Sequence, residues 1–137
     1  MPAMSGRCVC GKVTYSAEAE PIFSGICHCR TCQRATGSAF ASVVAIPAAA
    51  LTITGDVKQY DGVGDSGKAT HRRFCPDCGA SISLSADIMD GVVMLPIGTL
   101  DDPSWVKPAM QIYCEAAQPW ALLAGEMQRF PKMPGPG

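Results

Sequence analysis

The sequence predicts a mainly β fold with one short helix, and three observations support this prediction. Apolar and polar residues alternate in several short runs, which is the pattern of half-buried strands. The 14 glycines and 11 prolines supply many turns between these runs. Residues 30–36 predict a helix of one or two turns, and Gly37 follows in the position of a C-terminal cap.

Short runs along the chain predict seven to nine strands. Val13 and Tyr15 alternate with polar residues in 7–16, and apolar residues alternate with serines in 80–85. A turn at Gly55-Asp56 predicts that 51–54 and 57–60 form a hairpin. The other runs predicted as strands are 22–27, 40–46, 69–74, 92–97 and 110–114. We expect the glycine-rich residues 61–68 to form a mobile loop.

Length and composition indicate one domain with an ordinary core. A chain of 137 residues, 47% of them hydrophobic, can bury a sizeable core by itself. We expect the domain to span 6–125 and residues 126–137, rich in proline and glycine at their end, to form a frayed tail. The formal net charge of -1 gives no positive field, so we expect neither nucleic acid nor a membrane surface as a partner.

The ends of the chain and its hydropathy bear on the compartment. Residues 1–7 contain no apolar run, so we expect no signal peptide, and no stretch is long and apolar enough to span a bilayer. The prediction is therefore a cytoplasmic protein. Thiols stay reduced in the cytoplasm, and clustered cysteines there bind metal more often than they form disulfides.

Seven of the eight cysteines fall into three tight groups. These groups are Cys8 and Cys10, then Cys27, Cys29 and Cys32, then Cys75 and Cys78. Zinc takes about four ligands, and structural zinc sites commonly have four cysteines. Seven thiols divide into four plus three, which indicates one closed structural site and one site with a position left for water or substrate.

Spacing leaves two partitions of the thiols open. In the favoured partition Cys27, Cys29 and Cys32 share one ion, and the first and last pairs meet at the other. The rival partition joins Cys8 and Cys10 to Cys29 and Cys32, and leaves Cys27 with the last pair. The favoured partition keeps the compact trio together and lets a structural metal link distant segments, whose closure entropy grows only slowly with length.

Other interpretations of the cysteines compete with metal binding. The tight spacings and the absence of a signal peptide disfavour a disulfide framework of eight cysteines. The run Cys29-Arg30-Thr31-Cys32 could act as a redox pair, but such motifs belong in βαβ surroundings. Cys114 stands alone in an apolar run, and we expect it in the core rather than as a pocket thiol.

Residues near the trio each allow two interpretations. We expect His28 to be a hydrogen-bonded or surface histidine, with a proton shuttle as the alternative. We expect Arg30 and Arg34 to compensate negative charge, with binding of a substrate carboxylate as the alternative.

Residues expected on an exposed strand are His71, Arg72 and Arg73. Residues expected in the core rather than in a pocket wall are Phe40, Trp105 and Trp120.

Five motifs follow one another between residues 8 and 120. They are Cys8-Val9-Cys10-Gly11, Gly25-Ile26-Cys27-His28-Cys29 with Cys32 and Gly37, Arg72-Arg73-Phe74-Cys75-Pro76-Asp77-Cys78-Gly79, Gly98-Thr99-Leu100-Asp101-Asp102-Pro103, and Pro119-Trp120. In this order they resemble the GFA family, which is named for glutathione-dependent formaldehyde-activating enzyme and shared with a centromere protein V-like branch.

The resemblance implies a fold, two metal sites and an activity. The implied fold is a tent-like arrangement of small antiparallel sheets. The implied sites are a structural zinc on Cys8, Cys10, Cys75 and Cys78, and a catalytic zinc on Cys27, Cys29 and Cys32. The implied activity is that of a carbon–sulfur lyase, which reversibly joins glutathione and formaldehyde into S-hydroxymethylglutathione.

We therefore expect a zinc-dependent enzyme of carbon–sulfur lyase type, with two zinc ions per chain. Its partner would be a small thiol or thiol adduct, with glutathione as the candidate that the resemblance names. The alternative is a non-enzymatic zinc-binding module that interacts with other proteins.

Overall fold

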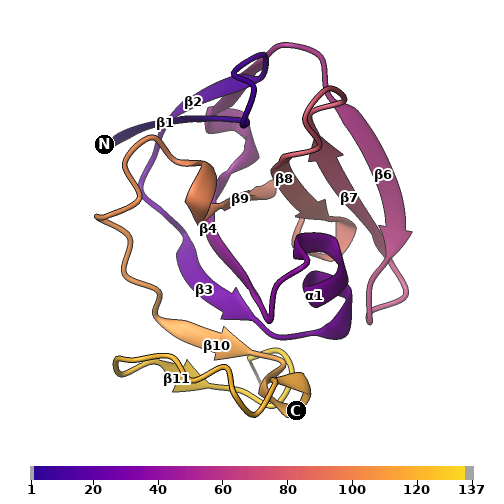
Figure 1. Ribbon diagram of the computed structural model, residues 1–137, viewed down its shortest axis with the longest axis vertical. Coiled ribbons are helices and arrows are strands. Elements are labelled where there is room, and N and C mark those ends of the chain that lie inside the picture. Colours follow the sequence, from indigo (N-terminus) through magenta and orange to yellow (C-terminus); the bar gives the residue numbers. More distant parts are fainter. Residues whose placement is uncertain (1, 135–137) are drawn as a thin grey trace.

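A computed structural model describes residues 2–134, whose strands form two sheets (Figure 1). The smaller sheet has the order β1-β2-β5. Its strands are β1 (Ala3–Arg7), β2 (Thr14–Glu18) and β5 (Leu51–Thr54). Side chains of β1 and β2 alternate between exposed and buried, because one face of the sheet packs on the core.

The larger sheet has eight strands in the order β11-β10-β3-β4-β9-β8-β7-β6. Their bounds are β3 (Phe23–Cys27), β4 (Ala41–Pro47), β6 (Lys58–Val63), β7 (Ala69–Phe74), β8 (Ser81–Ala86), β9 (Val92–Pro96), β10 (Met110–Ile112) and β11 (Gln128–Arg129). Neighbours are antiparallel except at β10, which is parallel to both β3 and β11. The predicted mainly β fold is confirmed.

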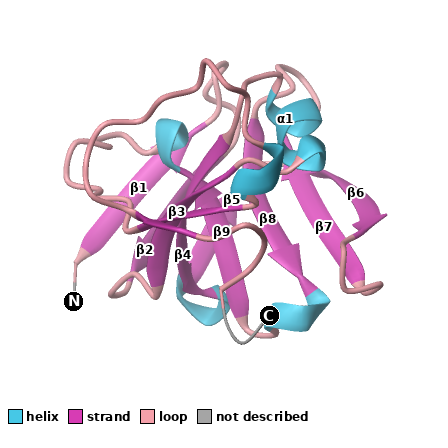
Figure 2. Ribbon diagram, turned by 90° about the horizontal axis from the view of Figure 1, so that it is seen from below, coloured by secondary structure: helices cyan, strands magenta, loops and turns pink. Residues whose placement is uncertain are grey.

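One α-helix, α1 (Arg30–Thr36), has the bounds that the sequence predicts. It ends at Gly37, whose φ of 67° is left-handed and whose N–H donates to the carbonyl of Gln33. Figure 2 shows α1 near one end of β7 and β8. Four 3-10 turns complete the described elements: η1 (Ala48–Ala50), η2 (Asp87–Met89), η3 (Ile97–Thr99) and η4 (Cys114–Ala116). Within residues 2–134, no helix has the length and apolar character needed to cross a membrane.

The buried core joins the two sheets. Tyr15 of β2 belongs to the same apolar cluster as Ile46 of β4 and Leu95 of β9. Cys8 and Cys75 are members of this cluster as well. The loops that carry these two cysteines are therefore anchored in the core rather than attached to its surface.

Three predictions about local structure are wrong. Residues 7–16 do not form one strand, because 8–13 leave the sheet as a loop and β1 pairs with β2 on either side of it. The hairpin predicted at Gly55-Asp56 does not form, because β5 pairs with β2 whereas β6 pairs with β7. The loop predicted at 61–68 is shorter, because β6 continues to Val63 and β7 begins at Ala69. Residues 2–134 form eleven strands rather than the seven to nine predicted, because β1 and β2 replace one predicted strand and β11 was not predicted.

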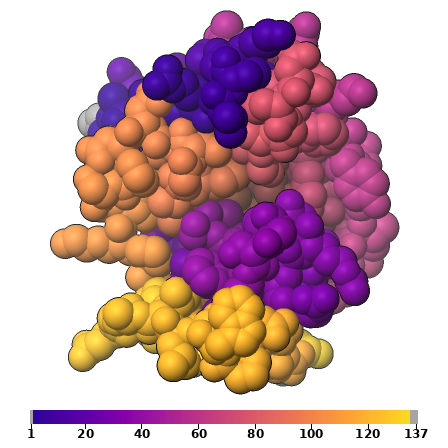
Figure 3. Space-filling view, in the orientation of Figure 1, coloured from indigo at the N-terminus to yellow at the C-terminus, as the bar shows by residue number. Residues whose placement is uncertain are grey.

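The described part of the C-terminal segment is paired with the sheet. In β11, Gln128 and Arg129 lie opposite Met110 and Gln111 of β10. The N–H of Cys114 donates to the carbonyl of Phe130 at 3.0 Å. Figure 3 shows this segment, in yellow, packed against the violet part of the chain, which includes β3 and α1. Residues 128–132 are thus hydrogen-bonded to the sheet and to the segment that follows β10. The rest of the predicted tail, 135–137, lies outside the described residues, and the boundary at 125 stays a prediction.

Candidate metal centres

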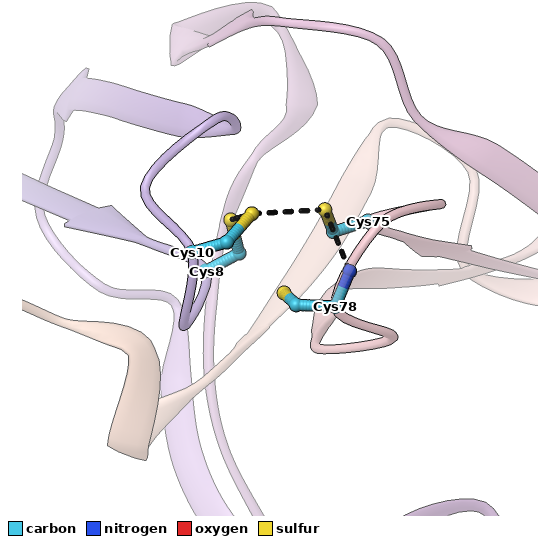
Figure 4. A group of neighbouring side chains, drawn as sticks. All are labelled: Cys8, Cys10, Cys75 and Cys78. Atoms are coloured by element: carbon cyan, nitrogen blue, oxygen red, sulfur yellow. Dashed lines mark hydrogen bonds between the residues drawn. The ribbon is translucent and has the colours of Figure 1, made fainter.

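Four cysteine sulfurs meet where the two sheets approach each other. Cys8 and Cys10 lie in the loop between β1 and β2, and Cys75 and Cys78 lie in the turn between β7 and β8. Figure 4 shows the four side chains pointing toward one another from these two loops. All four sulfurs lie within 4.8 Å of one another. We call this set the four-cysteine group.

The spacing of these sulfurs fits a zinc ion. The Sγ atoms of Cys8 and Cys10 are 3.6 Å apart, and those of Cys10 and Cys75 are 3.7 Å apart. Four sulfurs placed tetrahedrally about 2.3 Å from a zinc ion would lie about 3.8 Å from one another. The donor set and its spacing therefore match a closed structural site.

Backbone geometry in both loops supports this arrangement. Gly11 and Gly79 follow the paired cysteines with φ of 80° and 77°, a left-handed conformation that glycine adopts readily. The N–H groups of Val13 and Cys78 donate to sulfurs, at 3.3 Å to Cys8 and 3.5 Å to Cys75. Hydrogen bonds from backbone N–H groups, first that of Ala80, lower the pKa of Cys78 to about 6. Such bonds stabilise thiolates, the form that binds metal.

The second group joins the end of a strand to the start of the helix. Cys27 ends β3, Cys29 is the residue before α1, and Cys32 lies in the first turn of α1. Their three sulfurs lie within 4.8 Å of one another. We call this set the three-cysteine group. The structure thus brings the thiols together as the favoured partition predicts, and it does not bring together the pairs of the rival partition.

The three thiols influence one another's protonation. Hydrogen bonds from the thiols of Cys27 and Cys32 lower the pKa of Cys29 to about 2. Hydrogen bonding to Cys29 and Cys32, together with burial, raises the pKa of Cys27. The N–H of Cys32 also donates to the sulfur of Cys29 at 3.3 Å. One thiolate is therefore stabilised in this group even before a metal ion displaces the remaining protons.

A cavity of about 500 Å³ opens beside the three-cysteine group. All three of its cysteines line the cavity, and none of the four-cysteine group does. Tyr113 also lines it, and this residue has a left-handed φ of 55°, which is uncommon for a residue with a side chain. Burial, followed by the nearby carboxylate of Asp65, raises the pKa of Tyr113 to about 12. The phenol is accordingly protonated at neutral pH.

Arg72 brings a positive charge to this cavity. Its Nη2 lies 4.0 Å from the sulfur of Cys32, and its side chain is half-buried in the cavity wall. The prediction that Arg72 decorates an exposed strand is wrong, because β7 turns this side chain toward α1. Arg30 and Arg34 are exposed and line a different depression, together with Trp120.

Buried polar side chains hold the loop that carries the three-cysteine group. His28 is fully buried, and its Nε2 donates to Oε1 of Gln111 in β10 at 2.8 Å. Gln33 donates from Nε2 to the backbone carbonyl of His28 at 2.6 Å. The interpretation of His28 as a hydrogen-bonded histidine agrees with this geometry. Sequence reasoning did not predict the burial of Gln33 and Gln111, since no spacing marks a polar side chain that will be buried.

Cys114 and three aromatic side chains differ in how deeply they are buried. Cys114 is half-buried in η4, and its thiol lies 3.5 Å from the carbonyl of Gln111. Phe40 packs near His28, with ring centroids 5.9 Å apart. Trp105 and Trp120 are 39% and 72% exposed, so their expected place in the core is wrong. All eight cysteines lie within residues 2–134, and each is a free thiol there.

Comparisons with known proteins agree with this architecture. A family model described as glutathione-dependent formaldehyde-activating enzyme (GFA) matches residues 3–116. A search of curated proteins gives no match. A crystal structure of a Rhodobacter sphaeroides protein, solved as a structural genomics target, is 20% identical with a TM-score of 0.60, covering 77% of this chain and 92% of that chain. The likeness to this crystal structure shows a shared fold. Because the family model spans most of the sequence, including both cysteine groups, the chain belongs to the GFA family.

Proposed function

We propose that the protein is a zinc-dependent enzyme that forms and breaks a carbon–sulfur bond in a small thiol adduct. The observation that carries this proposal is the three-cysteine group, whose sulfurs all line one cavity. Three protein ligands leave one position of a zinc ion for a substrate, whereas four close the site. The name of the family, which refers to glutathione and formaldehyde, supports thiol and aldehyde as the reacting groups.

The two cysteine groups take different roles in this proposal. Cys8, Cys10, Cys75 and Cys78 hold a structural zinc ion, and Cys27, Cys29 and Cys32 hold a catalytic one. Zinc bound at the three-cysteine group would supply Lewis-acid chemistry, which lowers the pKa of a thiol or polarises a carbonyl oxygen. Arg72 offsets part of the negative charge of the three thiolates, so that a further anionic sulfur can enter the cavity.

The proposed reaction adds a thiol to an aldehyde. The thiol gives up its proton, its sulfur bonds to the carbonyl carbon, and the carbon–oxygen π bond breaks as the oxygen takes up a proton. The reverse reaction breaks the carbon–sulfur bond and returns thiol and aldehyde. Tyr113, protonated at neutral pH and located in the cavity wall, can donate a hydrogen bond to that oxygen.

The test combines metal content with the rate of the reaction. We expect about two zinc ions in the wild type, and about one in Cys29→Ser with the fold retained, because each group binds its ion separately. Nuclear magnetic resonance with ¹³C-formaldehyde and 2-mercaptoethanol measures exchange between free and thiol-bound formaldehyde. Wild type should accelerate this exchange at least tenfold over buffer, and Cys29→Ser should not.

Cys114→Ser is the matched control, since Cys114 belongs to neither group. It should keep both zinc ions and the exchange rate of the wild type. A single zinc ion in the wild type would contradict the proposed site. Two zinc ions without accelerated exchange would favour the alternative, a non-enzymatic zinc module, for which the exposed Trp120 and Leu122 could provide a contact surface.

A further inference from the structure

The cavity beside the three-cysteine group has a wall of hydrocarbon and thioether groups. Four of the seven methionines of the chain line it, namely Met89, Met94, Met110 and Met133. Methionine side chains are flexible and polarizable, and they suit surfaces that adapt to apolar ligands of varied shape. Strands favour β-branched and aromatic residues, so the formation of a sheet does not explain four methionines around one cavity.

Exposed apolar residues surround the same cavity. Val63, Ile88 and Met133 line it and are 72%, 57% and 48% exposed. They come from β6, from η2 and from the C-terminal segment, so distant parts of the chain place apolar groups together in contact with water. Exposed apolar clusters of this kind mark places where an apolar ligand or partner binds.

Charged groups are scarce in the wall. Among the lining residues, all of which lie within 2–134, Arg72 and Asp65 are the charged ones apart from the three cysteines. Arg72 already lies 4.0 Å from the sulfur of Cys32. Glutathione carries two carboxylates and one ammonium group, and burying charges without partners is costly. Size does not exclude glutathione, because about 500 Å³ lies within the roughly 300–1,000 Å³ of typical ligand pockets.

We propose that this cavity selects thiols with an apolar body, so that the substrate is the adduct of an aldehyde with a hydrophobic thiol rather than with glutathione. This inference rests on the proposed function, since it names the substrate class of the same site. The reaction is unchanged: the carbon–sulfur bond of the adduct breaks as the carbon–oxygen π bond forms, the hydroxyl group loses its proton, and the sulfur takes up a proton, so that thiol and aldehyde result. The apolar body of the thiol fills the methionine-lined space, and its sulfur faces the three cysteines.

Calorimetry on the zinc-loaded protein tests the proposal through binding rather than activity. The two probes are 2-phenylethanethiol and glutathione, each titrated without aldehyde. We expect 2-phenylethanethiol to bind at least tenfold more tightly, because both probes present a primary thiol and only the ring of 2-phenylethanethiol replaces water on the apolar wall.

A charge placed at the rim should change this preference. Ile88→Lys adds a second cation beside the cavity, and the exposure of Ile88 allows the variant to fold. We expect the preference for 2-phenylethanethiol to fall at least threefold. Leu122→Lys is the matched control, because Leu122 is 88% exposed and does not line the cavity. It adds the same charge and should keep the preference of the wild type.

The outcomes separate the substrate class from the proposed reaction. A tenfold preference for 2-phenylethanethiol supports the class even where formaldehyde exchange is not accelerated, in which case the reaction alone fails. Glutathione binding as tightly as 2-phenylethanethiol, or more tightly, overturns the class even where exchange is accelerated. An equal effect of Ile88→Lys and Leu122→Lys also overturns it, because the preference would then not arise in this cavity.

Discussion

Side chains distant in sequence from Cys27, Cys29 and Cys32 lie beside the three-cysteine group. Arg72 of β7 lies close to the sulfur of Cys32. Tyr113, the residue after β10, lines the cavity beside the three-cysteine group. His28, which lies between two of the cysteines, is turned away from solvent and bonded to Gln111. The loop between β3 and α1 is thus held by a hydrogen bond from the neighbouring strand, which restricts the positions of the three sulfurs.

His71, which precedes Arg72 in β7, stabilises the fold most when its imidazole is positively charged. Nδ1 of His71 lies 2.6 Å from Asp61, and Nε2 lies 2.8 Å from Asp87. Both carboxylates raise the pKa of His71 above 6.5, Asp61 more strongly than Asp87. Only the protonated imidazole can donate to both. The stabilisation is therefore complete below the unfolded pKa of about 6.5 and is lost as the pH rises through the higher folded pKa.

We predict that His71→Asn destabilises the protein more at pH 5.5 than at pH 9. Urea unfolding of wild type and variant at the two pH values measures this difference, with the same zinc concentration for both proteins so that the contribution of the metal sites cancels between them at each pH. Asp61→Asn should show the same pH pattern, since it removes the negative charge of one of the two carboxylates that stabilise the protonated imidazole. A difference between wild type and His71→Asn that does not vary with pH would contradict the prediction.

The sequence predicted the two cysteine groups better than it predicted their surroundings. The cysteines could be grouped because zinc requires several sulfurs at short spacing, and Cys75-Pro76-Asp77-Cys78-Gly79 provides this within one turn. Arg72 could not be assigned, because the face of β7 that meets α1 depends on the pairing of β7 with β6 and β8. Spacing along the chain contains no information about that choice.

At the scale of elements, β1 and β2 pack closely because one residue of β1 has no side chain. Gly6 lies opposite Tyr15 in the sheet, and a Cβ atom on Gly6 would overlap the ring and hydroxyl of Tyr15. Tyr15 is buried, and its hydroxyl is hydrogen-bonded to Thr99 at 2.7 Å. The ring has little room to move away.

We predict that Gly6→Ala lowers the free energy of unfolding by about 1–3 kcal/mol, the usual cost of inserting a methyl group into a packed interior. Urea unfolding followed by circular dichroism measures it. Gly98→Ala is the control, because a Cβ atom on Gly98 meets no atom within 4 Å. Equal stability of the two variants would show that Tyr15 can make room for the methyl group.

Local and non-local signals explain which elements could be predicted. The helix at Arg30–Thr36 was predicted correctly, since its cap at Gly37 lies within the same short segment. The hairpin at Gly55-Asp56 was not, although its turn residues are favourable, because β5 gains more by pairing with β2 and covering the core. Strand partners distant in sequence are chosen by the core, and a turn motif cannot reveal them.

At the scale of the whole molecule, the four-cysteine group connects the two sheets. Cys8 and Cys10 follow β1 of the smaller sheet, and Cys75 and Cys78 follow β7 of the larger one. Structural zinc contributes about 10–16 kcal/mol in small peptides, whereas whole domains are stable by only about 5–15 kcal/mol. An ion at this position could account for a large share of the stability of the protein.

We predict that Cys75→Ser abolishes stable folding, whereas Cys29→Ser does not. Cys75 is buried in the core between the sheets, so its loss removes one of the four proposed zinc ligands and leaves a hydroxyl in an apolar cluster. Circular dichroism at 25 °C should show loss of native β structure for Cys75→Ser and a wild-type spectrum for Cys29→Ser, and metal analysis should find at most one zinc ion in each. A folded Cys75→Ser with wild-type stability would mean that the core alone holds the sheets together, because the link between them would then contribute little.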